Sequence, residues 1–185
     1  INGDPLYAMP NTLNVSLRGV SSEALMIATK QYCGISNGSA CTSRSYRMSY
    51  VLSSMGIPEE DAESAIRISW GTDANLHDVE DSFRSLMNEW ERLHRQAERY
   101  KEMYPPGTRL ELISMDDPYA PVPPGTRGTV QYVGDASQIG MKWDDGRTLS
   151  LIPGEDSFRK LTPEELAEEQ NKNMNNEDTA PVMEM

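Results

Sequence analysis

The stretch "AIRISWGTDANLHDVEDSFRSL", Ala65–Leu86, changes from one hydrophobic period to another. In its first part, apolar side chains alternate with Arg67 and Ser69, which is the pattern of a β-strand with one buried face. After Asn75 the apolar residues recur at steps of three and four, which is the period of an α-helix. A strand that leads directly into a helix indicates a small α+β layer.

The helical period continues well beyond this stretch and predicts one long amphipathic helix over residues 76–103. Asn75 is its expected N-cap, and about 29 residues at 1.5 Å each give a length of roughly 43 Å. We expect the first half to lie over its own domain. The second half, from Trp90, should pack on a partner, a missing domain or the next module. The apolar positions form a heptad seam: Leu76, Val79, Phe83, Leu86, Trp90, Leu93, Ala97, Tyr100 and Tyr104.

Short elements are predicted upstream of this strand and helix. Ser21 or Ser22 is the expected cap of the first helix, and Gly34 suits the position just past its end. The predicted elements are a strand over 12–17, a helix over 21–32, at most a short strand at 34–36, and two short helices near 48–56 and 58–64.

The pentapeptide PPGTR occurs twice, at Pro105 and at Pro123, and each copy opens a predicted strand. "QIGMKW" and "RTLSLI" follow as further strands, joined by the turn Asp145-Gly146. Several short strands with no helix between them predict a small, partly open barrel over 104–161. A capping box at Thr162 then starts a short acidic helix, and a disordered tail is expected beyond Asn171.

The sequence thus predicts an α+β chain with three parts. Residues 1–103 form a small α+β domain that ends in the long helix, residues 104–161 form a β-barrel-like domain, and residues 162–185 form a short helix and a disordered acidic tail. Because the chain begins at Ile1 with the turn-like "NGDP", we expect these residues to be the end of something longer.

The composition limits the classes of function. The 185 residues carry a net charge of −12, which argues against sequence-independent binding to nucleic acid. Half of that excess lies in the tail after Leu161, with one basic and seven acidic residues. No apolar run is long enough to cross a membrane, and no leader peptide is recognisable. Only two cysteines occur, so neither a disulfide framework nor a zinc site is predicted, and a cytoplasmic location is expected.

The two cysteines have different surroundings. Cys33 comes directly after a predicted helix, next to Tyr32 and close to Ile35. A cysteine in such surroundings is usually a small buried apolar residue. Cys41 lies in "SNGSACTS", a stretch of small polar residues that favour turns, and Arg44 follows it. A nearby positive charge favours the thiolate, but from these residues alone a reactive and an incidental Cys41 are about equally supported.

The stretches "SNGSACTSRSYRMSYVLSSMG" and "ESAIRISWG" resemble the C-terminal portion of pyridoxal-phosphate-dependent cysteine desulfurases, in aminotransferase class V. "NGD…MPNTLNVSL" and "SSEALM" are similar to the same family in the same order, so the resemblance covers residues 1 to about 90. It implies sulfur supply for iron–sulfur clusters, for thiolation or for DNA phosphorothioate modification.

The resemblance implies roles for two residues. Cys41 matches the nucleophile that takes sulfur from L-cysteine as a persulfide, leaving L-alanine, and delivers it to a sulfur-acceptor protein. Arg67 matches the arginine that binds the substrate carboxylate. The family's cofactor lysine has no match here, so we expect this chain alone neither to bind pyridoxal phosphate nor to release sulfide. A homodimer, or a missing large domain as partner, is also implied.

Residues 104–161 resemble a small domain family of uncharacterised function that occurs in proteins of mobile elements. Their aromatic and arginine residues have two interpretations. They form a stacking and phosphate-binding surface for single strands, or the aromatics are core and the arginines pair with aspartates. The net charge favours the second. A groove for a protein or peptide is equally open. A non-enzymatic adaptor that binds protein or nucleic acid is the alternative to an enzyme. The residues concerned are Tyr119, Tyr132, Trp143, Arg109, Arg127 and Arg147.

Overall fold

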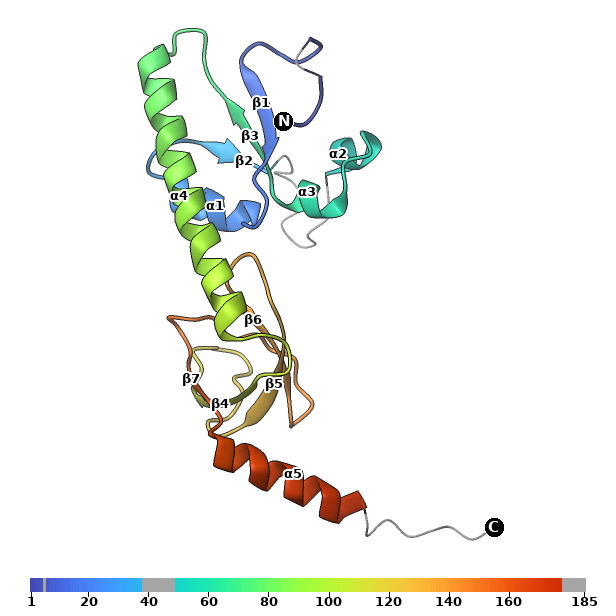
Figure 1. Ribbon diagram of the computed structural model, residues 1–185. Coiled ribbons are helices and arrows are strands. Elements are labelled where there is room, and N and C mark those ends of the chain that lie inside the picture. The colour runs from blue at the N-terminus through green and yellow to red at the C-terminus, as the bar shows by residue number, and fades with distance from the viewer. Residues whose placement is uncertain (5, 38–48, 178–185) are drawn as a thin grey trace, which may run out of the picture. The chain divides into compact units, whose positions relative to one another are not determined.

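The computed structural model describes residues 1–4, 6–37 and 49–177, and the side chains of 172–177 are outside that description. The chain divides into two compact units (Figure 1). The first contains residues 1–100 with 135–137, and the second contains residues 101–134 and the chain from 138 onward. Each unit has its own antiparallel sheet and its own hydrophobic core. The predicted α+β fold is confirmed.

The sheet of the first unit has three antiparallel strands in the order β1-β3-β2. These are β1 (Thr12–Ser16), β2 (Ile35–Ser36) and β3 (Ala65–Ser69). The alternation read from the sequence is confirmed, because Ile66 of the central strand is fully buried while Arg67 beside it is exposed.

Three short helices complete the first unit: α1 (Ser22–Thr29), α2 (Tyr50–Ser54) and α3 (Glu59–Glu63). Ser21 caps α1 by accepting the backbone N–H of Ala24 at 3.4 Å. The helix ends at Thr29, well before Gly34, because the Thr29 carbonyl accepts the N–H of both Tyr32 and Cys33 in a tight turn. The predicted extent to Tyr32, with Gly34 just past the end, is therefore too long.

The long helix α4 (Leu76–Met103) begins as predicted, with the Asn75 side chain accepting the N–H of His77 at 3.0 Å. Its packing differs from the prediction. The first turns are lifted from the sheet, so that Leu76 is 72% and Phe83 41% exposed. The middle of α4 packs instead, with Leu86 buried in the first unit's core.

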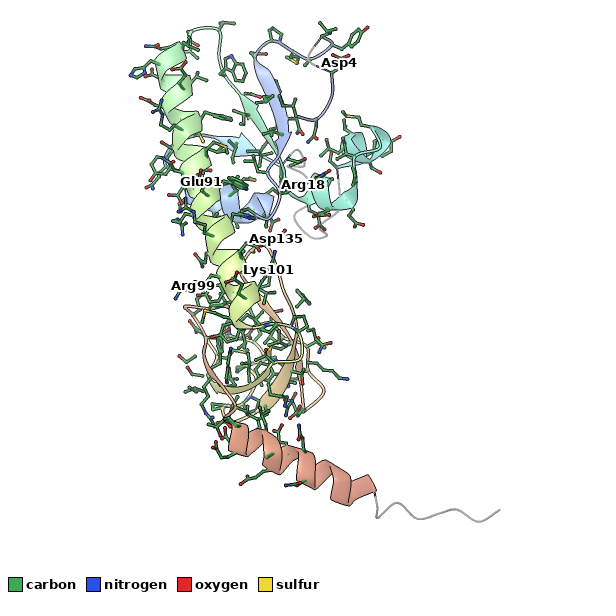
Figure 2. All side chains as sticks on the ribbon, in the orientation of Figure 1. Asp4, Arg18, Glu91, Arg99, Lys101 and Asp135 are labelled. Carbon is green, nitrogen blue, oxygen red and sulfur yellow. The ribbon has the colours of Figure 1, made fainter. Side chains whose placement is uncertain are left out.

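Trp90 and Leu93 contact this same core, which corrects the expectation that the helix from Trp90 packs on something else. The Trp90 indole donates to the carbonyls of Leu17 and Arg18, each at 3.2 Å, and its ring stacks on His94 at 5.3 Å. At the end of the seam, Tyr104 does pack on the core of the second unit. Glu91 of α4, labelled in Figure 2, forms an ion pair with Arg95 one turn later.

The second unit is a four-stranded antiparallel sheet in the order β6-β5-β4-β7. Its strands are β4 (Arg109–Ser114), β5 (Arg127–Val133), β6 (Ile139–Trp143) and β7 (Ser157–Lys160). The sheet is open, which agrees with a partly open barrel. The predicted strand "RTLSLI" is wrong: only Leu151 bridges to Ile139, while Ser157–Lys160 pairs with β4 as the fourth strand.

The repeated PPGTR forms two equivalent turns. In each copy the threonine hydroxyl donates to the carbonyl of the first proline at 2.7 Å. The glycines have φ of +90° at Gly107 and +82° at Gly125, a backbone conformation that side chains disfavour. This is why the same five residues start both β4 and β5.

The two copies are related by an approximate twofold axis through the β4–β5 hairpin. Leu110 pairs directly with Gly128, which stands at the same place in the second copy. A side chain at Gly128 would come within 2.8 Å of the Trp143 ring, which explains why the copies differ there. Each turn glycine donates its N–H to the other copy's strand: Gly107 to Val130 at 2.9 Å, and Gly125 to Leu112 at 2.7 Å.

The last helix, α5 (Pro163–Glu177), starts with the predicted capping box. Thr162 N–H donates to Glu165 at 2.8 Å, and the Glu165 N–H donates back to the threonine hydroxyl at 3.3 Å. The helix extends past Asn171, where a disordered tail was expected to begin, because a helix with a capped first turn propagates at little cost. Among the described residues, no helix is both long and apolar enough to cross a membrane.

Candidate functional site

Arg67 lies at the centre of the polar face of the first unit's sheet. It occupies the middle of the central strand, with Asn14 and Ser36 as its cross-strand neighbours on β1 and β2. Its side chain is exposed. Within the described residues, no hydrogen bond or ion pair holds its guanidinium, which has five N–H donors.

The strand residues around Arg67 on this face are short and neutral. The Asn2 amide donates to Asn14 at 2.7 Å and to Ser16 at 2.8 Å, so the segment before β1 crosses this face. At the far end, the hydroxyls of Thr12 and Ser69 lie 3.2 Å apart. Short side chains leave the Arg67 fork accessible from solvent.

Arg18 borders this region at the end of β1. The guanidinium of Arg18, which Figure 2 labels, forms an ion pair with Asp61 of α3, and the Ser16 hydroxyl donates to the Asp61 carbonyl at 2.7 Å. The hydrogen bond from Arg18 lowers the pKa of Asp61. These contacts tie α3 to the strand that flanks Arg67.

Cys41 lies outside the described residues, as does the rest of 38–48. The two ends of that segment are described. It follows Asn37, directly after Ser36, and it returns at Ser49 before α2. Because Ser36 pairs with Arg67, the chain enters the segment that carries Cys41 beside the arginine.

Cys33 packs at the edge of the first unit's core, which supports its interpretation as a small apolar residue. It is only half-buried, so it is less buried than the sequence led us to expect. Burial nevertheless raises the pKa of its thiol, and a hydrogen bond with Thr29 partly opposes that rise. A thiol with a raised pKa is a poor nucleophile near neutral pH.

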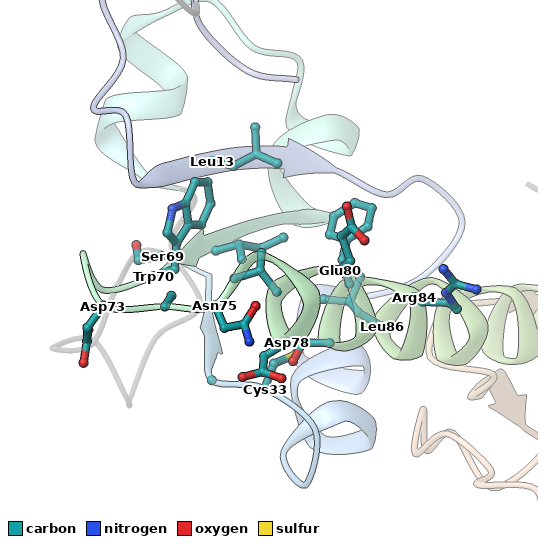
Figure 3. A pocket seen from close by; sticks show the side chains of 16 residues that line it. Leu13, Cys33, Ser69, Trp70, Asp73, Asn75, Asp78, Glu80, Arg84 and Leu86 are labelled. Carbon is teal, nitrogen blue, oxygen red and sulfur yellow. The ribbon is translucent and has the colours of Figure 1, made fainter.

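A cavity of about 740 Å³ opens where the first turns of α4 stand off the sheet (Figure 3). Its walls are mostly apolar and come from Leu13, Ile68, Phe83 and the Cys33 region, with acidic groups such as Asp78 at the rim. The heptad seam did not predict this cavity, because Leu76 and Phe83 have the spacing of residues that pack on a neighbouring element.

The cavity and Arg67 belong to opposite faces of the sheet. Leu13 and Ile68 point into the cavity, whereas Arg67, next to Ile68 along β3, points to the other side. The cavity is therefore not a pocket around the candidate carboxylate-binding arginine.

The described lysines do not fit pyridoxal phosphate. A Schiff-base lysine needs a cleft with partners for the phosphate and the ring. No lysine lines the cavity described above: Lys30 and Lys142 are exposed, Lys101 lies in the last turn of α4, and the Lys160 ammonium lies 5.1 Å over the Tyr104 ring.

The three aromatic residues considered for the second unit are not alike: Tyr119 and Tyr132 are exposed, which corrects the expectation that all three are core, and Trp143 is buried. Trp143 is 1% exposed and donates to the Leu149 carbonyl at 2.7 Å, so it is a core residue. Arg109 pairs with Asp144, and Arg147 pairs with Asp145. Arg127 pairs with glutamates, among them two on α5 that the sequence did not suggest as partners.

Comparisons with known proteins relate the two parts of the chain to different proteins. It is 38% identical over 119 residues to cysteine desulfurase IscS of Anaeromyxobacter sp. (strain Fw109-5), covering 64% of this chain and 29% of that protein. For IscS of Methylococcus capsulatus the identity is 38% over 113 residues, or 61% and 28% of the two chains. For IscS of Aeromonas hydrophila it is 36% over the same length.

A family model described as a domain of unknown function (DUF4314) matches residues 94–161, from the last turns of α4 to the end of the second sheet. The chain spans less than a third of the length of the desulfurases it matches. The resemblance read from the sequence is thus confirmed: part of the chain is similar to a segment of cysteine desulfurases, and it is joined to a domain of unknown function.

Proposed function

We propose that the first unit is the part of a cysteine desulfurase that carries the sulfur-accepting thiol, Cys41, and the substrate-binding arginine, Arg67. The observation that carries this proposal is the position of Arg67. It is exposed on a polar sheet face, with no described partner, beside the point where the chain enters the cysteine segment.

The proposed reaction moves one sulfur atom. The Cys41 thiolate attacks the sulfur of L-cysteine, an S–S bond forms, and the C–S bond of the substrate breaks. The substrate carbon takes a proton, so the products are L-alanine and a persulfide on Cys41. Transfer of the outer sulfur to an acceptor protein restores the thiol.

Arg67 would hold the substrate during this transfer. A guanidinium offers two parallel N–H donors that match the two oxygens of a carboxylate. Ser36 is five positions before Cys41, so the thiol-bearing residue lies within roughly 18 Å of the strand beside Arg67 at full extension. That reach allows the thiol to approach a substrate bound at Arg67.

The rest of the enzyme belongs to this proposal as well. Pyridoxal phosphate would be held by residues other than those described here, in a large domain or a partner subunit of a homodimer. It labilises the C–S bond when bound. Iron–sulfur cluster assembly, thiolation and DNA phosphorothioation in the cytoplasm are the pathways to which the sulfur would go.

The test is a chimera of the Anaeromyxobacter desulfurase in which the segment that aligns with this chain is replaced by the chain itself. We expect the chimera to form L-alanine from L-cysteine. Arg67→Lys should raise KM for L-cysteine roughly tenfold or more, because an ammonium cannot make the paired contact. Alanine is quantified by chromatography over a range of substrate concentrations.

Arg84→Lys is the matched control, since Arg84 lies at the rim of the cavity on the other side of the sheet. It should leave KM unchanged. The isolated 185-residue chain is mixed with pyridoxal phosphate, and the unbound cofactor is then removed. The chain should show no cofactor absorbance. A chimera that holds pyridoxal phosphate yet makes no alanine contradicts the proposal.

The two thiols should also differ in reactivity. A thiol-directed reagent at neutral pH should modify Cys41 well before Cys33, because burial raises the pKa of the Cys33 thiol and keeps it protonated. Labelling of Cys33 should accelerate as the pH rises, as its thiolate forms. Peptide mass spectrometry at successive times measures both rates.

Cys33→Ser and Cys41→Ser variants assign each rate to its residue. Equal rates at neutral pH, or faster labelling of Cys33, would argue against an activated Cys41.

A further inference from the structure

Three arginines of the second unit converge on two glutamates of α5. Arg109 of β4 makes two hydrogen bonds to the Glu169 carboxylate, each 3.0 Å, and Arg127 of β5 makes a third at 3.0 Å. Arg159 of β7 binds Glu165 through both terminal nitrogens, at 2.7 and 2.8 Å. We call Arg109, Arg127 and Arg159 the arginine face.

The repeated pentapeptide builds two-thirds of this face. Arg109 and Arg127 are the last residues of the two PPGTR copies, so the approximate twofold axis brings them together. Each also reaches across the hairpin to the same position of the other copy: Arg109 donates to Thr129 at 3.1 Å, and Arg127 donates to Glu111 at 3.2 Å. The duplication thus presents two guanidinium groups to one carboxylate.

The contacts that attach α5 to the sheet are mainly ionic. Between the two bound glutamates, Leu166 is half-buried, while most other described α5 side chains are exposed. The hydrogen bond from Arg159 lowers the pKa of Glu165 to about 2, so this carboxylate stays charged across the physiological range. A helix held mainly by charge is sensitive to salt and to competing charges.

The match to the domain of unknown function ends at residue 161, before α5 begins. The matched region therefore includes all three arginines and neither glutamate. The arginine face therefore lies inside the matched region, and α5, which covers it, lies after that region.

We propose that the arginine face is a binding site for an acidic helix of a partner protein, and that α5 is its built-in occupant. The recognised pattern is two glutamates four residues apart, with a leucine after the first, as in Glu165, Leu166 and Glu169. A partner helix of this pattern replaces α5, and α5 limits access to partners that compete well.

The charges around the face favour an acidic helix over nucleic acid. Glu111 and Asp144 lie within it, with Arg109 to Asp144 distances of 2.6 and 2.7 Å and an Arg159 to Glu111 distance of 2.9 Å. With α5 removed, three arginines face two carboxylates, an excess of one positive charge. That excess suits one more carboxylate-bearing segment, but a phosphate backbone requires several uncompensated cations.

The test uses a fluorescent peptide with the sequence of residues 162–177 and the full-length chain. A tethered occupant acts at an effective concentration on the order of millimolar, so micromolar peptide should not displace α5 from the unmodified chain. Glu165→Gln with Glu169→Gln weakens the tethered helix. We expect this double variant to bind the peptide at least about tenfold more tightly than the unmodified chain does, and less tightly as salt rises.

Glu164→Gln with Glu168→Gln is the matched control, because it removes the same charge at the same spacing from exposed positions of α5. It should bind the peptide no better than the unmodified chain. A peptide carrying glutamine at both bound positions should not bind any variant. In the unmodified chain, hydrogen exchange of α5 amides should accelerate from about 0.05 to 0.5 M salt, a readout that needs no substitution.

Equal peptide affinity for the double variant and the control would overturn the proposal. Slow, salt-independent exchange of α5 would do so too, since the helix would then be held by something other than charge. The third arm of the experiment uses a single-stranded oligonucleotide with the same net charge as the peptide. If it binds the double variant more tightly than the peptide does, the face is a nucleic-acid site and the acidic-helix assignment is wrong.

Discussion

Replacing Cys41 by alanine in the chimeric desulfurase is expected to reduce alanine formation on the order of 10⁴-fold or more, as losses of a covalent nucleophile do in other enzymes. Without the thiolate, no acceptor for the substrate sulfur remains, so the C–S bond is not broken productively. Substrate binding at Arg67 should persist, and the loss should therefore fall on kcat rather than on KM. The rate of alanine production at saturating L-cysteine measures the loss in kcat.

Cys33→Ala is the control for this substitution. Cys33 lies on the core side of the sheet, away from Arg67, and should leave kcat within a factor of about two. Retention of persulfide on the protein, detected by mass spectrometry, should disappear only with Cys41. If the Cys41→Ala chimera still turns over at a comparable rate, the sulfur does not pass through this residue.

Replacing Trp143 by alanine is expected to destabilise the second unit by about 3–5 kcal/mol. The ring is almost fully buried in the cluster with Leu110, Leu112 and Val130, and its removal leaves a large cavity. The substitution also leaves the Leu149 carbonyl without the indole donor it now accepts at 2.7 Å. Denaturant unfolding, followed by circular dichroism and by hydrogen exchange of the β5 and β6 amides, gives the free-energy change.

Tyr119→Ala is the matched control in the same unit. Tyr119 is 93% exposed, so its removal should change stability by no more than about 0.5 kcal/mol. If Trp143→Ala unfolds at the same denaturant concentration as the unmodified chain, the packing described for the second unit is wrong.

Periodicity predicted the elements whose burial follows a regular pattern. Ile66 and Arg67 were assigned to opposite faces of a strand because alternation is a property of the backbone. The start of α4 followed from Asn75 as a cap. The exposure of Leu76 and Phe83 was not predictable, because spacing shows which residues share a helix face and not whether anything covers that face.

Pairings between segments far apart in the sequence were the second feature that sequence reasoning did not predict. "RTLSLI" alternates as a strand does, yet Ser157–Lys160 takes the place beside β4. Likewise, the sequence suggested aspartates as partners of the arginines, which holds for Arg109 and Arg147. It did not reveal Glu165 and Glu169, because they lie on a helix whose docking depends on tertiary structure.

For the candidate site, the roles of Cys41 and Arg67 came from the resemblance, while the structure shows which residues surround Arg67. It places Arg67 among short neutral side chains and next to the strand that leads toward Cys41. Residue types alone favoured a solvated or ion-paired structural arginine at that position. The cavity beside Cys33 had no counterpart in the sequence reasoning, since its lining comes from β1, β3, α4 and the segments that connect them.

The twofold relation between the PPGTR copies has a consequence for tolerance to mutation. Arg109 and Arg127 bind the same carboxylate, so the loss of either one leaves Glu169 with a guanidinium partner. The duplicated turn thereby gives the docking of α5 a redundancy that a single arginine would lack. Glu165 also has two guanidinium partners, but the second, Arg127, lies 3.5 Å away, so the short contacts of that attachment come from Arg159 alone.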